Sequence, residues 1–153
     1  MPAKIPVKIL GIGENKEKFI EEGIANFIRL LAPFAPVECN WIKSAKDPKE
    51  ESRFLLSKIK KDEYTIALHP PEISGKTPDS LEFAGKLNRW REHAKKLVFI
   101  IGGAYGHSDI LLKDVNEKLS LSAQTYSHQL IRLMLLEQLY RGFTILSGHP
   151  YHK

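Results

Sequence analysis

The stretch LVFIIGG, residues 97–103, decides the fold class of this chain. Its first five residues form a continuous apolar run of strand length, which is typical of a strand covered on both faces. The two glycines that follow predict a loop in which the backbone approaches its neighbours closely. Strands of this kind belong to parallel sheets flanked by helices, so we expect an α/β domain with a mostly parallel sheet.

Strands and helices alternate along the rest of the chain. Apolar patterning predicts the strands at 4–11, 37–42, 64–68, 97–101 and 118–122. Helices are expected between them, capped by Asn15 and by Asp47, and starting at Thr77. Phe54 and Leu81 are expected on the buried faces of the second and third helices. We find no linker or repeat, so residues 1–153 are predicted to be a single domain.

The last predicted helix, about residues 126–145, carries apolar residues around its whole circumference. Such a helix is buried on all sides. It either runs through the centre of its own domain or is covered by a second subunit, and both can hold. Its few polar residues form two groups: His128 and Arg132 on one side, and Glu137 and Arg141 roughly opposite, where they could pair.

Composition excludes several classes of protein. The longest apolar runs are far below the roughly 20 residues of a membrane-spanning helix. The amino terminus has no signal-peptide pattern, and the lone Cys39 rules out an intrachain disulfide and a CxxC metal site. A cytoplasmic protein without a metal fits these features. The net charge of +5 suits a partner that carries phosphates, although charge alone is weak support for nucleic-acid binding.

Three segments follow predicted strands and are rich in glycine or small polar residues: His69–Lys76, Gly102–Ser108 and Ser120–His128. Ligands of parallel sheets bind beyond the carboxyl ends of the strands, so the three segments predict one small-molecule pocket. Taken singly, the glycine segment is equally well read as a structural turn, and the segment from Ser120 is more simply read as a loop with a helix cap. The tail Gly148–Lys153 combines an aromatic ring with cationic groups, a combination suited to stacking on an unpaired base.

Four motifs make the chain resemble the RlmH (YbeA-type) family of small bacterial methyltransferases. They are IGGAYG (101–106), LSLSAQTYSHQLIR (119–132), LEQLYR (136–141) and GHPYHK (148–153). The resemblance implies a SPOUT-class α/β fold with a C-terminal trefoil knot. It also implies S-adenosyl-L-methionine as the methyl donor, N3 of a pseudouridine in 23S rRNA of the assembled ribosome as the target, and a homodimer.

The resemblance also implies the site residues. The methyl donor would contact Leu68, Gly102, Gly103, Ser122, Ala123, Gln124, Thr125, Tyr126 and Ser127. The base pocket would be lined by His128, Glu137, Arg141, Tyr151 and His152, with the tail supplied by the partner subunit and no metal involved. Arg141 is the candidate for electrostatic stabilisation. A histidine is the natural general base, and the choice between His128 and His152 stays open.

Two alternatives remain open at this point. One is a non-catalytic RNA-binding or ribosome-assembly module with the same fold. The other is a SPOUT methyltransferase that acts on tRNA. The intact donor-loop and tail motifs favour the enzyme, because a protein that only binds RNA does not need them.

Overall fold

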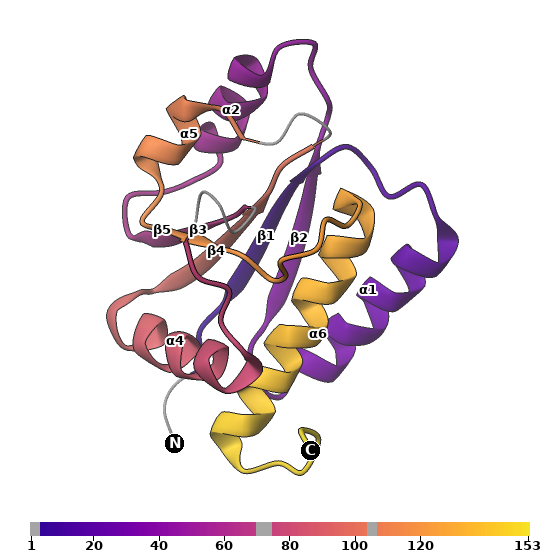
Figure 1. Ribbon diagram of the computed structural model, residues 1–153, viewed down its shortest axis with the longest axis vertical. Coiled ribbons are helices and arrows are strands. Elements are labelled where there is room, and N and C mark those ends of the chain that lie inside the picture. Colours follow the sequence, from indigo (N-terminus) through magenta and orange to yellow (C-terminus); the bar gives the residue numbers. More distant parts are fainter. Residues whose placement is uncertain (1–3, 70–74, 104–106) are drawn as a thin grey trace.

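The computed structural model describes residues 4–69, 75–103 and 107–153 (Figure 1). Its sheet contains five parallel strands in the order β2-β1-β4-β3-β5. The strands are β1 Val7–Ile12, β2 Val37–Ile42, β3 Glu63–Leu68, β4 Lys96–Ile101 and β5 Glu117–Leu119. The predicted α/β class and parallel sheet are confirmed. The last strand is shorter than expected, because pairing with β3 ends where Leu119 meets Leu68.

The helices form a layer on each face of the sheet. They are α1 Lys18–Leu31, α2 Pro48–Ser57, α4 Ser80–His93, α5 Asp109–Asp114 and α6 His128–Ser147. On one face α6 packs between α1 and α4, and on the other α2 packs beside α5 (Figure 1). No helix in these described ranges combines the length and the apolar character that crossing a bilayer would need.

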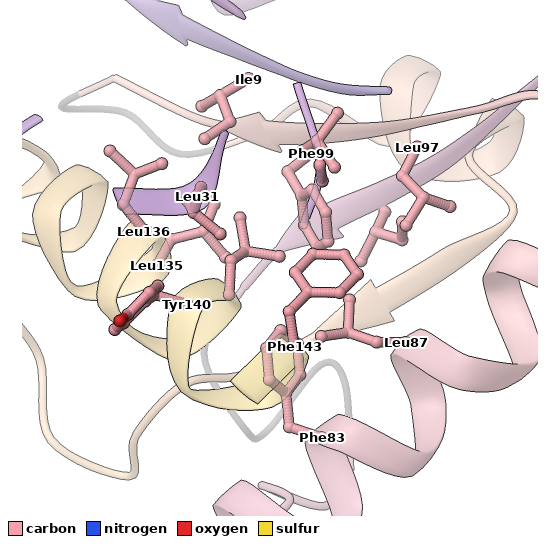
Figure 2. Packing of buried hydrophobic residues seen from close by; sticks show 14 of the residues in the cluster. Ile9, Leu31, Phe83, Leu87, Leu97, Phe99, Leu135, Leu136, Tyr140 and Phe143 are labelled. Atoms are coloured by element: carbon pink, nitrogen blue, oxygen red, sulfur yellow. The ribbon is translucent and has the colours of Figure 1, made fainter. Parts of the chain in front are cut away.

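Alternation along the strands fills two separate cores. In β1, Ile9 points to the α1, α4 and α6 layer, and Leu10 points to the α2 and α5 layer; both are fully buried. Figure 2 shows the larger core, where Phe99 of β4 packs with Phe143 of α6 and Leu87 of α4. Apolar contact on both faces is what the continuous run 97–101 predicted.

Glycines bring α6 close to the helices on either side. A Cβ on Gly142 would lie 2.5 Å from Leu87 Cδ1 of α4, and a Cβ on Gly23 of α1 would lie 2.6 Å from Leu133 Cδ1 of α6. Of the two explanations for the apolar circumference of α6, the structure confirms burial within its own domain, since the helix runs through the centre of its layer. A stripe that includes Leu130 and Met134 is only half-buried.

Four local predictions are wrong. The helix expected to start at Thr77 starts at Ser80, because the side chain of Asp79 caps it. The cap of α1 is Glu17 rather than Asn15, and the helix starts correspondingly later. Phe54 is 51% exposed and Leu81 is 60% exposed. On α4 the buried stripe begins at Phe83, about 200° around the helix from Leu81. Apolar character alone could not show which of several apolar residues faces the sheet.

Candidate active site

The carboxyl ends of β4, β3 and β5 lie side by side, because these strands are neighbours that run in the same direction. Leu68 ends β3 opposite Leu119, the last residue of β5. Gly102 and Gly103 follow directly after β4. The three segments expected to converge therefore begin at one edge of the sheet (Figure 1). Parallel sheets bind their ligands at this edge.

Hydrogen bonds join the segment after β3 to the segment after β5. The main-chain N–H of His69 donates to the carbonyl of Leu119 at 2.9 Å. The hydroxyl of Thr77 donates to Ser120 Oγ at 3.1 Å, and Ser120 Oγ donates to the carbonyl of Ser122 at 3.0 Å. Because Ser120 is buried, these bonds fix the point at which the segment after β5 reaches the surface.

The segment that leads from β5 into α6 is irregular but partly self-bonded. Ser122 Oγ accepts from the main-chain N–H of Gln124 at 3.0 Å, and the Tyr126 hydroxyl donates to Gln124 Oε1 at 2.8 Å. The main-chain N–H groups of Ala123 and Thr125 make no hydrogen bond to another group that the structure describes. Exposed donors of this kind suit the polar edge of an adenine or a carboxylate.

Ser127 is the N-cap of α6. Its Oγ accepts from the main-chain N–H of Leu130 at 3.2 Å, so this hydroxyl is already used inside the chain. The structural reading of this position, a helix cap, therefore holds for the Ser127 side chain. The O–H of this hydroxyl and the main chain remain for a ligand.

Gly103 lies against β1. A Cβ at this position would stand 3.1 Å from Ile12 Cγ2 and 3.9 Å from Glu51 Oε1. A side chain here would therefore require Ile12 or the segment itself to shift by a few tenths of an ångström. Residues 104–106, which complete the predicted glycine loop, lie outside the described residues.

Two histidines meet at the same edge of the sheet. The rings of His69 and His107 stand edge to face with their centroids 5.8 Å apart. The pKa of His107 is lowered to about 4, first by burial and then by the neighbouring His69, while the main chains of Ile100 and Leu68 oppose the shift. His107 is therefore neutral at pH 7 and adds no positive charge where the resemblance places a cationic donor. The sequence reasoning did not single it out.

Arg132 is a buried cation on α6 that the sequence reasoning left without a role. Its side chain is 0% exposed, and Nη2 donates to the carbonyls of Ile12 at 2.6 Å and Gly13 at 2.8 Å. Nη1 donates to Asn15 Oδ1 at 2.8 Å, and the guanidinium lies 4.1 Å from the ring centroid of Trp41. The guanidinium thus fastens the end of β1 to α6. An arginine in an otherwise apolar helix was the signal that could have revealed it.

The carboxyl-terminal tail folds back onto α6. Gly148 has a φ of 76°, and its left-handed conformation ends the helix with bonds from His149 N–H to Thr144 O and from its own N–H to Ile145 O. Glycine is favoured there because it has no Cβ. The reversal directs Tyr151 and His152 back toward the last turns of the helix.

Four of the five expected base-pocket residues lie together in this way. Arg141 Nη2 pairs with Glu137 Oε1 at 2.5 Å, and Arg141 Nη1 lies 3.1 Å from His152 Nδ1. The Tyr151 hydroxyl donates to Glu137 Oε1 at 3.0 Å, and its ring lies under the Arg141 guanidinium at 4.9 Å. The hydrogen bond to Glu137 is the main factor that raises the pKa of Arg141, which stays charged. The pair expected at the i, i+4 spacing is present.

His128 is separated from the other four. It is the first residue of α6, so it lies about 14 Å along the helix axis from Glu137 and about 20 Å from Arg141. Burial lowers the pKa of His128, and the positive charges of Arg132 and Lys16 lower it further. Within one chain, a single base cannot contact both His128 and the tail.

A groove connects the middle of α6 to the segment after β5. It has a volume of about 410 Å³, and Leu121, Met134 and Glu137 line it together with the start of α4. Within the described parts of the chain, no group of three or more histidine, cysteine or acidic side chains is placed to hold a metal ion.

The fold and the strand-end site define the class of protein, and comparison with known families agrees. A family model described as "Predicted SPOUT methyltransferase" matches residues 5–152. This chain belongs to that family of methyltransferases. A solved structure described as a probable methylase family protein from Haemophilus influenzae Rd KW20 superposes with a TM-score of 0.58 over 96% of this chain and 70% of the other. At 10% identity this likeness concerns the fold alone.

Curated relatives narrow the class further. Proteins named Ribosomal RNA large subunit methyltransferase H from Bacillus thuringiensis (strain Al Hakam) and Bacillus cereus (strain B4264) are each 41% identical over 160 residues. Each alignment covers 96% of this chain and 99% of the relative. The resemblance to the RlmH family stated from the sequence motifs is confirmed.

Proposed function

We propose that this methyltransferase transfers a methyl group from S-adenosyl-L-methionine to N3 of a pseudouridine in 23S rRNA, as a cytoplasmic homodimer. The name of the 41%-identical relatives supports a large-subunit rRNA substrate. The observation that carries the proposal is the separation of the two halves of the site, the donor-loop end of α6 and its tail end.

The strand-end residues fit the methyl donor. The exposed N–H groups of Ala123 and Thr125 are available to it, and the hydroxyl of Ser122 is at the surface of the same segment. Main-chain groups at Leu68, Gly102 and Gly103 would close the other side. Bound S-adenosylmethionine supplies a methyl group that its sulfonium already activates, so the chain has only to hold it and to prepare the acceptor.

The acceptor nitrogen must lose a proton before it can attack. The two candidates to accept this proton are His128, whose pKa is lowered by burial, and His152, whose Nδ1 lies 3.1 Å from Arg141 Nη1. Arg141 is able to stabilise the negative charge that develops on the ring, because its guanidinium is fixed by Glu137. The ring of Tyr151, 36% exposed, is available for stacking on the base.

Two copies of the chain would bring these parts together. In a two-fold dimer with antiparallel α6 helices, the first turn of one α6 meets the last turn of the other. The half-buried stripe through Leu130 and Met134 and the exposed Leu81 on neighbouring α4 offer apolar surface for such contact. We propose this composite site, and with it the knotted C-terminal segment that the family resemblance implies.

Methyl transfer from labelled S-adenosylmethionine is the test. We expect labelling of 70S ribosomes from a strain that lacks the modification, and no labelling of bulk tRNA. Labelling of tRNA instead would show that the protein is a tRNA methyltransferase. Calorimetry with S-adenosylmethionine tests the alternative of a non-catalytic RNA-binding module, since such a module would bind no donor.

A further inference from the structure

A second groove lies at the edge of the sheet, between the end of β2 and α2. Its volume is about 860 Å³, and residues 40–46 line it together with Glu50, Phe54 and Lys58. Lys43, Lys46 and Lys58 are all exposed, and none of them pairs with an acidic residue in the described part of the chain. With Glu50 as the acidic group of the lining, the groove carries a net positive charge.

Phe54 adds an aromatic ring to this positive surface. It is 51% exposed, although its neighbour Leu55 is buried in the core at 1% exposure. An exposed phenyl ring among unpaired lysines has the chemistry of a platform for single-stranded nucleic acid, where the bases stack and the phosphates meet cations. Because both faces of a dimer contact here would carry these lysines, like charges oppose self-association through the groove.

The groove is connected to the donor side of the active site through Glu51. This carboxylate is buried, and its Oε2 accepts from Ser44 Oγ at 3.1 Å and from Ala45 N–H at 3.0 Å. A Cβ on Gly103 would lie 3.9 Å from the other oxygen, Oε1. One side chain therefore separates the lysine-bearing segment after β2 from the glycine segment after β4. Both segments follow the carboxyl ends of parallel strands, so they leave the sheet at the same end (Figure 1).

We propose that this groove binds an unpaired stretch of the RNA substrate. Lys43, Lys46 and Lys58 contact phosphates, and the ring of Phe54 stacks on a base. An RNA strand seated there passes the glycine segment on its way to the methyl donor. The inference rests on the proposed function for the identity of the ligand as RNA, and it adds a binding surface on the opposite side of the sheet from α6.

The test uses a fluorescein-labelled twelve-nucleotide oligouridylate and fluorescence anisotropy over a series of salt concentrations. We expect Phe54→Leu, which keeps apolar packing but removes the ring, to weaken binding at least about fivefold. The triple change of Lys43, Lys46 and Lys58 to Gln should flatten the dependence of log affinity on log salt by about 2, because three phosphate contacts are lost.

Matched variants at other surfaces serve as controls. Phe19→Leu removes a ring that is 59% exposed on α1. The triple change of Lys4, Lys61 and Lys95 to Gln removes the same charge at the amino-terminal edge of the sheet, where all three lysines are exposed. We expect these controls to bind the oligonucleotide within about twofold of the unchanged protein, since exposed residues away from a contact have small effects.

Several results would overturn the inference. They are no binding of oligouridylate by the unchanged protein at low salt, an unchanged affinity in both groove variants, and an equal loss in the controls. Loss of dimers in the groove variants, measured by sedimentation, would show instead that the groove joins two copies. Failure of the proposed function gives a different result. If the unchanged protein methylates no ribosome, but only the groove variants lose affinity for oligouridylate, then the groove binds RNA and the proposed reaction is wrong.

Discussion

Replacing Arg132 with Met should destabilise the folded protein substantially. Methionine has an unbranched side chain and a helix propensity close to that of arginine, so α6 itself is little affected. The change removes the guanidinium that bonds to Ile12 O, Gly13 O and Asn15 Oδ1. It also removes the cation from the face of Trp41.

The magnitude follows from the groups left behind. Two main-chain carbonyls lose their donor, and each unsatisfied buried group costs about 1–3 kcal/mol. The lost contact with Trp41 adds about 1 kcal/mol. Relief from burying an uncompensated cation opposes these losses, because burial lowers the pKa of Arg132 to about 10 and so disfavours its charged form. The net expected loss is about 3 kcal/mol, or roughly 6–12 °C in Tm for a chain of this size.

Urea unfolding measures this loss, with all variants at the same protein concentration because the unfolding free energy of a dimer depends on it. Arg132→Lys keeps the charge but not the planar fork, and should lose about half as much. Arg29→Met on the exposed side of α1 is the control and should stay within about 0.5 kcal/mol. If the free energy of unfolding of Arg132→Met lies within about 1 kcal/mol of that of the unchanged protein, the hydrogen bonds of Arg132 only offset the desolvation of its guanidinium. The contacts of Arg132 with the end of β1 would then not be a source of stability.

Four further changes probe the site and the packing. Arg141→Ala should abolish methyl transfer while calorimetric donor affinity stays within a few-fold; normal turnover would show that the base pocket lies elsewhere. Removal of residues 151–153 should do the same and leave the dimer folded by circular dichroism, whereas full activity after truncation would refute a role for the tail. Because the pKa of His107 is lowered to about 4, its contribution to stability is complete above pH 6.5 and is lost as the pH falls toward 4, by about 3 kcal/mol. His107→Phe should therefore flatten the fall in urea midpoint between pH 6.5 and 4.5, and an unaltered fall would assign it to other groups. Gly142→Val should cost about 1–3 kcal/mol by forcing Leu87 aside, and an unchanged Tm would mean that α6 and α4 can move apart freely.

The fold could be predicted because its signals are local. A continuous apolar run identifies a strand covered on both faces, and Asp47 does cap α2 as its spacing predicted. The pairing of Glu137 with Arg141 follows from helix geometry alone. What failed was orientation: Phe54 and Leu81 are apolar but point outward, and no periodicity marks which apolar face a sheet will cover.

The site was less accessible from the sequence because its geometry depends on contacts between distant parts of the chain. The role of Arg132 depends on Ile12 and Gly13, which are 120 and 119 residues away. The return of the tail to Glu137 depends on one backbone angle at Gly148. The motifs of the family point to candidate residues, but only the fold shows that His128 stands apart from the other four.

The length of α6 between His128 and Arg141 implies that two inactive variants can complement each other. In the proposed dimer, a subunit damaged at His128 and another damaged in the tail each retain what the other lacks. Mixed at random, half of all dimers are hybrids, and each hybrid holds one intact pocket and one doubly damaged pocket. Two inactive proteins should thus restore about a quarter of the normal activity when unfolded and refolded together. An enzyme whose active site lies entirely within one subunit would show no such recovery of activity.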